Sequence, residues 1–157
     1  MADFLLPIFM KRKDVTHLKR RERFDLEQVH ANASTWKADA TLKAAVLAAG
    51  GANTAAGRAI AEGKAVAING NMTAGFGSAG DALLGKVETY HSDDTMTVQD
   101  VGYTSFTGVS GSLPTAGDVV VVNASGAVMA STGATGRCFV ADVGTSAVTG
   151  PVMVFIG

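Results

Sequence analysis

The chain of 157 residues is 47% hydrophobic, contains a single cysteine and has a formal net charge of −1. This composition excludes a disordered linker, because the apolar residues are sufficient for a core, and it excludes an internal disulfide. The near-neutral total hides a division: residues 1–64 contain 11 Lys and Arg against 7 Asp and Glu, whereas residues 65–157 contain 2 against 7. We therefore expect a basic, Ala-rich arm over residues 1–64 and a compact module over residues 65–157.

The N-terminal leader, Met1–Met10, is apolar and contains five large side chains, Phe4, Leu5, Leu6, Ile8 and Phe9. Basic residues follow this leader, whereas a secretory signal peptide has its basic residues first. The sequence has no run of 18 apolar residues, the length that a membrane-spanning helix needs. We therefore expect synthesis in the cytoplasm and no association with a membrane.

A basic cluster follows the leader, and its members are Lys11, Arg12, Lys13, Lys19, Arg20, Arg21 and Arg23. It could form a solvated helical face, contact nucleic acid by releasing counterions from phosphates, or dock on an acidic protein surface. Acidic residues at positions 22, 25 and 27 interleave with the cluster, and no aromatic platform accompanies it. The pattern favours protein docking through the leader and the cluster together, and makes nucleic acid the weaker alternative.

Helical spacing of apolar residues predicts a helix over Asp14–Val29. A second helix is expected after a Ser34-Thr35 cap, through Ala49, with Gly50-Gly51 as its left-handed end. Residues 53–62 fit either a short helix or an extended approach to the first strand. The arm is therefore predicted to be partly helical.

The remainder of the chain has the pattern of short strands separated by turn residues. The fold class that we predict is mainly β, an antiparallel sandwich or small barrel preceded by the partly helical arm. Residues 119–122 are apolar throughout and predict a central strand covered on both sides, whereas residues 95–99 alternate. The predicted strands are Ala65–Asn69, Leu83–Tyr90, Thr95–Asp100, Tyr103–Thr107, Asp118–Asn123, Ala127–Ala130, Cys138–Val143 and Val152–Ile156.

Two Gly-rich motifs resemble nucleotide-binding sequences, but both lack the residues that the chemistry requires. Gly75–Gly80 has the dinucleotide spacing, but a helix of useful length does not follow it. Gly80–Lys86 has the phosphate-loop spacing, but Val87 stands where a hydroxyl should ligate magnesium. The three histidines are far apart, and Cys138 lies in an apolar run typical of a buried, inert thiol. We therefore predict no catalytic, cofactor-binding or metal-binding residues, and no enzyme.

The β half resembles the small head-decoration, or cement, proteins of tailed bacteriophages over roughly residues 60–157. In that family a Gly-Asp-x-Val strand, a Gly hairpin, a Gly-x-apolar strand and a short final strand recur in this order. Here the resemblance is carried by Gly80–Val87 with the alternating strand Thr95–Asp100, by Ala116–Val128, which includes the Gly117–Asn123 strand and the Ser125-Gly126 hairpin, by Gly136–Val143 and by the closing Gly150–Ile156.

The resemblance implies a structural virion protein on the outer surface of a phage capsid, where it would brace neighbouring major capsid subunits. It makes the major capsid protein the expected partner of the docking residues in the arm. The few charges of the β module also favour self-association as a homodimer or homotrimer. The alternatives are a tail or fibre-base module and a small nucleic-acid-binding protein that uses the basic arm.

Overall fold

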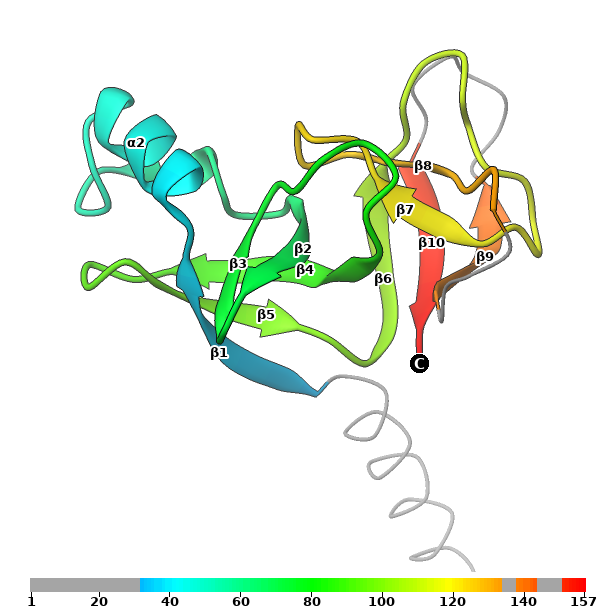
Figure 1. The fold of residues 1–157 in the computed structure, drawn as a ribbon, viewed down its shortest axis with the longest axis horizontal. Helices are drawn as coiled ribbons and strands as arrows, with labels where there is room; N and C mark the ends of the chain where they lie inside the picture. Colours follow the sequence, from blue (N-terminus) through cyan, green and yellow to red (C-terminus); the bar gives the residue numbers. More distant parts are fainter. Residues whose placement is uncertain (1–31, 134–137, 144–150) are drawn as a thin grey trace, which may run out of the picture.

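A computed structural model describes residues 32–133, 138–143 and 151–157 of the chain (Figure 1). The described residues confirm the mainly β prediction, with a five-stranded closed barrel, a three-stranded sheet, a two-stranded sheet and two short helices. The helix expected over Asp14–Val29 lies outside the described residues, as do all twelve predicted docking residues of the arm.

The barrel has the strand order β1-β3-β2-β4-β5, and β5 closes it by pairing with β1. Only β1 and β3 pair in parallel, while the other neighbours are antiparallel. Register shifts interrupt the pairing of β2 with β3, β2 with β4, and β4 with β5, and such bulges bend strands strongly enough to close a small barrel. The five strands are β1 (Ala33–Ala38), β2 (Ala65–Gly70), β3 (Thr73–Gly75), β4 (Leu83–Tyr90) and β5 (Thr95–Gln99).

Strand β1 overturns the helix start that the sequence suggested. The Ser34-Thr35 cap is wrong, because both residues lie inside β1 and face Val98 and Thr97 of β5 in register. The Ser34 hydroxyl donates to the carboxylate of Asp100 and thereby joins the outer end of β1 to the end of β5. The folded unit therefore begins before residue 65, since residues 33–64 of the predicted arm pack into it.

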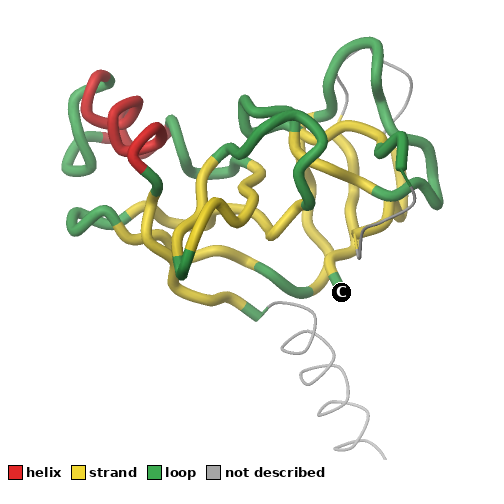
Figure 2. The backbone as a smooth tube through the Cα atoms, in the orientation of Figure 1, coloured by secondary structure: helices red, strands yellow, loops and turns green. Residues whose placement is uncertain are grey.

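Two helices lie together at one end of the molecule (Figure 2). Helix α2 (Ala40–Ala48) begins at Asp39, whose carboxylate accepts a hydrogen bond from the Leu42 amide at 2.7 Å. Its predicted end is confirmed, because Gly50 and Gly51 both have positive φ. The ambiguous residues 53–62 include the short helix α3 (Ala55–Ala59), which Thr54 caps through its hydroxyl.

Beyond the barrel, β6 (Gly102–Thr107), β10 (Pro151–Ile156) and β9 (Cys138–Val143) form an antiparallel sheet in the order β6-β10-β9. Strand β7 (Val120–Val122) pairs with β8 (Val128–Ala130). All three β7 residues are buried, as predicted, but β7 is not a central strand, since β8 is its one partner among the named strands.

Two buried clusters hold these parts together. One fills the barrel beneath α2 and includes Leu42, Val46, Tyr90 and Met96. The other joins Leu83 of the barrel to side chains of β6, β7, β8, β9 and β10. Because barrel residues belong to the second cluster as well, the sheets pack against the barrel through buried apolar side chains.

Candidate binding surface

The arm residues that the sequence predicts for docking all lie outside the described residues, so the structure does not test that prediction. The described residues contribute the surface of the folded unit itself. On that surface, the Gly-rich segment between β3 and β4 is the first candidate for a binding site.

The dinucleotide-like motif begins at the end of a strand and continues as a loop into β4. Gly75 is the last residue of β3, and the next regular element is β4, which starts at Leu83. A Cβ on Gly75 would lie 1.9 Å from Asp39 Oδ2, so this glycine provides room for the helix cap. The segment therefore lacks the helix N-terminus on which a pyrophosphate would sit.

The phosphate-loop motif is likewise part of the barrel wall. A Cβ on Gly85 would lie 2.1 Å from the carbonyl oxygen of Gln99, so glycine permits the close approach of β4 and β5. Lys86 lies within β4, and its Nζ is 3.6 Å from Glu88 Oε1. A phosphate loop needs its lysine at the start of a helix, and the lysine here lies on a strand.

The hairpin between β4 and β5 contains the Asp93-Asp94 pair, which the sequence placed at a solvated turn. Asp93 is exposed, and hydrogen bonds from the Thr95 hydroxyl and amide hold the pKa of its carboxyl below its usual range. Asp94 has a structural contact instead, since it accepts a hydrogen bond at 3.0 Å from the hydroxyl of Tyr90. Burial and this bond raise the pKa of Tyr90 well above its ordinary value.

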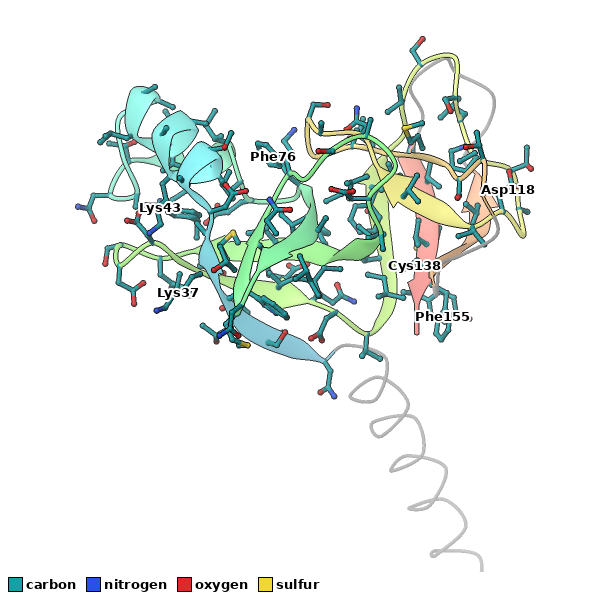
Figure 3. All side chains as sticks on the ribbon, in the orientation of Figure 1. Lys37, Lys43, Phe76, Asp118, Cys138 and Phe155 are labelled. Atoms are coloured by element: carbon teal, nitrogen blue, oxygen red, sulfur yellow. The ribbon has the colours of Figure 1, made fainter. Side chains whose placement is uncertain are left out.

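Asp94 also faces a lysine of α2: Lys43 Nζ lies 3.8 Å from Asp94 Oδ2. Lys37 and Lys43 lie at the same end of the molecule as α2, away from Asp118 and Phe155 (Figure 3).

Within residues 32–133, 138–143 and 151–157, no group of three His, Cys, Asp or Glu side chains could hold a metal ion. None of the helices in this part of the chain is long and apolar enough to cross a membrane.

Two adjoining hollows of about 420 and 490 Å³ form a groove on the described part of the chain. Both hollows are lined by Ile68 and Asp81, so they meet at these two residues. We name this concavity the Ile68 groove. Its apolar half is lined by Leu83, Leu84, Val120 and Cys138, and its polar half by Asp39, Thr41, Asn69 and Ser78.

No protein-family model matches the sequence, and no curated protein matches it.

The wall of the groove is held rigidly by the loop that joins β3 to β4. The Asp81 carboxylate accepts the Ser78 amide at 2.7 Å, and the Asp81 carbonyl accepts the Val122 amide at 3.0 Å. Gly77 has a φ of 67°, and a Cβ there would lie 2.9 Å from Ala67 Cβ. The loop therefore packs against β2 and β7 at the same time, which fixes the position of Asp81.

Two carboxylates give the polar half of the groove its charge. Asp39 caps α2 with one oxygen and accepts the side-chain amide of Asn69 with the other. Asp81 is exposed, and a carboxylate that accepts one or two hydrogen bonds still has lone pairs for a further donor. The groove can therefore bind a group that combines an apolar side chain with a cation.

Sequence reasoning missed this surface, because Asp39, Ile68 and Asp81 lie on three separate elements. One signal was present. Ile68 is a large apolar residue directly before the Asn69-Gly70-Asn71 turn, and the structure leaves 56% of it exposed.

The burial of Cys138, by contrast, was predicted correctly, and its thiol lies 3.5 Å from the Leu83 carbonyl.

Proposed function

We propose that this protein is a non-enzymatic structural component of a virion that binds the outer surface of a phage capsid. In this role it stabilises contacts between neighbouring major capsid subunits, as a capsid decoration or cement protein does. The residues that we propose for attachment are the apolar leader and the basic cluster of the N-terminal segment. The protein would be made in the host cytoplasm, and self-association as a homodimer or homotrimer would place several arms on one particle surface.

The observation that carries the proposal is the order of strands in the β half. Within the described residues, the parts of the pattern that resembles the decoration proteins lie in strands and turns of the β half. Gly117–Asn123 contains β7, Ser125-Gly126 forms the turn before β8, and residues 138–143 and 151–156 are β9 and β10. Gly126 has a φ of 80°, which the tight turn of such a hairpin demands.

The distribution of charge supports attachment through the N-terminal segment. Seven of the 13 basic residues lie within residues 1–31, ahead of the first barrel strand, whereas residues 65–157 have a net charge of −5. A basic segment attached to an acidic module is steered toward acidic partner surfaces. Apolar side chains in the leader then supply the buried contacts that give such an interface most of its affinity.

A reconstitution experiment tests this function. Undecorated phage heads would be mixed with the full chain and with a variant in which the seven basic residues of the cluster are changed to Gln. We expect the full chain to sediment with the heads and the variant to remain in the supernatant at the same concentration. Equal binding of both proteins would contradict attachment through the cluster, and binding to tails alone would favour the tail-module alternative. Binding to nucleic acid with a steep salt dependence would favour the alternative of a small nucleic-acid-binding protein that uses the basic arm.

A further inference from the structure

The Ile68 groove has an apolar half that adjoins an acidic half, and the chain contains a segment with the complementary order. In the segment Phe4–Lys13, large apolar residues are followed directly by Lys11-Arg12-Lys13. An apolar side chain between Ile68 and Leu83 would leave the following basic residues next to Asp81 and Asp39. We propose that, in the free protein, the groove binds this N-terminal segment of the chain.

Exposure of apolar groups supports the proposal from both sides. Ile68 is 56% exposed although it borders the buried residues Leu83 and Val120. The leader has five large apolar residues within six positions, and a stretch of this kind left in water promotes aggregation. One contact would therefore remove both apolar surfaces from solvent.

Charge complementarity selects this segment over other partners. The groove contributes the carboxylates of Asp39 and Asp81, and no Lys or Arg is among the described residues that line it. Lys11-Arg12-Lys13 is one of two runs of three consecutive cations in the sequence, and it is the one that directly follows the run of large apolar residues in the leader. Each ion pair at this partly exposed site would contribute modestly, so we expect the apolar contact to supply most of the affinity.

The length of the chain ahead of the barrel is sufficient for the contact. The carbonyl of Asn32 accepts the Asp100 amide at 3.0 Å, which anchors the start of the folded unit at the Asp100 end of β5. Asp39 lies at the opposite end of β1, about 20 Å away at 3.3 Å per strand residue. The 18 residues between Lys13 and Asn32 span about 27 Å even as a continuous helix, and more when extended.

The contact in the groove would form before the protein attaches to a capsid, and it depends on the attachment role proposed above for the leader. The leader would have two alternative surfaces, the groove in the free protein and the capsid on the particle. Attachment would then replace one contact of the leader by another, so the leader would remain covered at both stages.

Hydrogen exchange of the full-length free protein tests the contact. We expect the amides of residues 4–13 to exchange at least about tenfold more slowly in the protein than in the isolated peptide of residues 1–13. Ile68→Lys places a cation in the groove and removes its apolar anchor, so the protection should disappear. Met72→Lys is the matched control, because Met72 is 54% exposed on the same hairpin and does not line the groove. Its protection should equal that of the unmodified chain.

A second variant guards against a folding defect in the groove. Phe9→Asp changes the leader and leaves the barrel sequence intact, and it should also abolish protection of residues 4–13. Protection that survives in both Ile68→Lys and Phe9→Asp, or that is absent from the unmodified chain, would overturn the proposal. The measurement contains no capsid, so its failure is distinct from a failure of attachment.

Discussion

The carboxylate of Asp39 occupies the space that a side chain on residue 75 would need. A Cβ built on Gly75 would lie 1.9 Å from Asp39 Oδ2 and 2.3 Å from its carboxyl carbon. The same carboxylate caps α2 through the Leu42 amide and accepts the side chain of Asn69 at the end of β2. One acidic side chain therefore joins the helix to two strands of the barrel, and the absence of a side chain on Gly75 makes this possible.

Gly75→Ala should destabilise the protein by about 2–4 kcal/mol, because it adds an overpacking cost to the loss of the helix cap. Urea unfolding followed by circular dichroism measures this change. Gly70→Ala is the control on the same hairpin, since a Cβ there meets only Thr73 Cβ at the ordinary distance of 3.7 Å. It should change the free energy of unfolding by less than about 0.5 kcal/mol. Equal effects of the two substitutions would contradict the assigned role of Asp39.

Tyr90 should make the stability of the fold depend on alkaline pH. Its pKa is raised in the folded state by burial and by the hydrogen bond to Asp94, whereas in the unfolded chain it lies near 10. The contribution of Tyr90 is therefore complete below about pH 10 and declines as the pH rises toward the folded-state pKa. The free energy of unfolding should fall as the pH rises above about 10 in the unmodified chain and fall less steeply in Tyr90→Phe. Parallel curves for the two proteins would show that Tyr90 does not titrate differently in the folded state.

Magnesium and ATP should leave the protein unchanged. The residues that imitate a phosphate loop form the loop before β4 and the first half of β4, where Gly85 packs on the Gln99 carbonyl. We expect millimolar MgATP to leave the melting temperature unchanged, both in the unmodified chain and in the variant Lys86→Ala. A ligand present at 100 times its dissociation constant would add about 2.7 kcal/mol and would raise the melting temperature clearly. Such a rise would contradict the structural assignment of these glycines.

Removal of residues 1–31 should preserve cooperative unfolding, whereas removal of residues 1–39 should abolish it. The longer deletion takes away β1, which closes the barrel through five register pairs with β5, and it takes away the Asp39 cap. Thermal unfolding followed by circular dichroism distinguishes the two proteins. If both deletion proteins unfolded with the same midpoint, β1 would not be the strand that closes the barrel.

Several strands could be predicted from the sequence because turn chemistry and side-chain period agree there. Leu83–Tyr90 and Cys138–Val143 were predicted with the bounds that the structure has, and residues 95–99 alternate as expected, with Met96 and Val98 buried. Strand β3 was missed because its three residues are too few to show a period. Strand β1 was missed because Ser34 and Thr35 suit a helix cap as well as a strand, and only pairing with β5 decides between them.

The candidate groove could not be predicted, for a different reason. Ile68 is the first exposed residue of β2, Asp81 lies in the loop before β4, and Asp39 precedes α2. Closure of the barrel, rather than any spacing along the chain, brings these three residues together. The identity of Asp39 as a cap was available from the sequence, since Asp precedes an apolar periodic stretch, but the Ser-Thr pair five residues earlier was a competing signal.

Electron microscopy of the purified phage particle tests the proposed function most directly. The account predicts density for the β module on the outside of the head, at junctions between major capsid subunits, with density for the N-terminal segment running from it onto the capsid. Particles assembled without this chain should lack that density and should release their contents at a lower temperature. Heads that lack the protein in the unmodified phage, or density for it confined to the tail, would contradict the account.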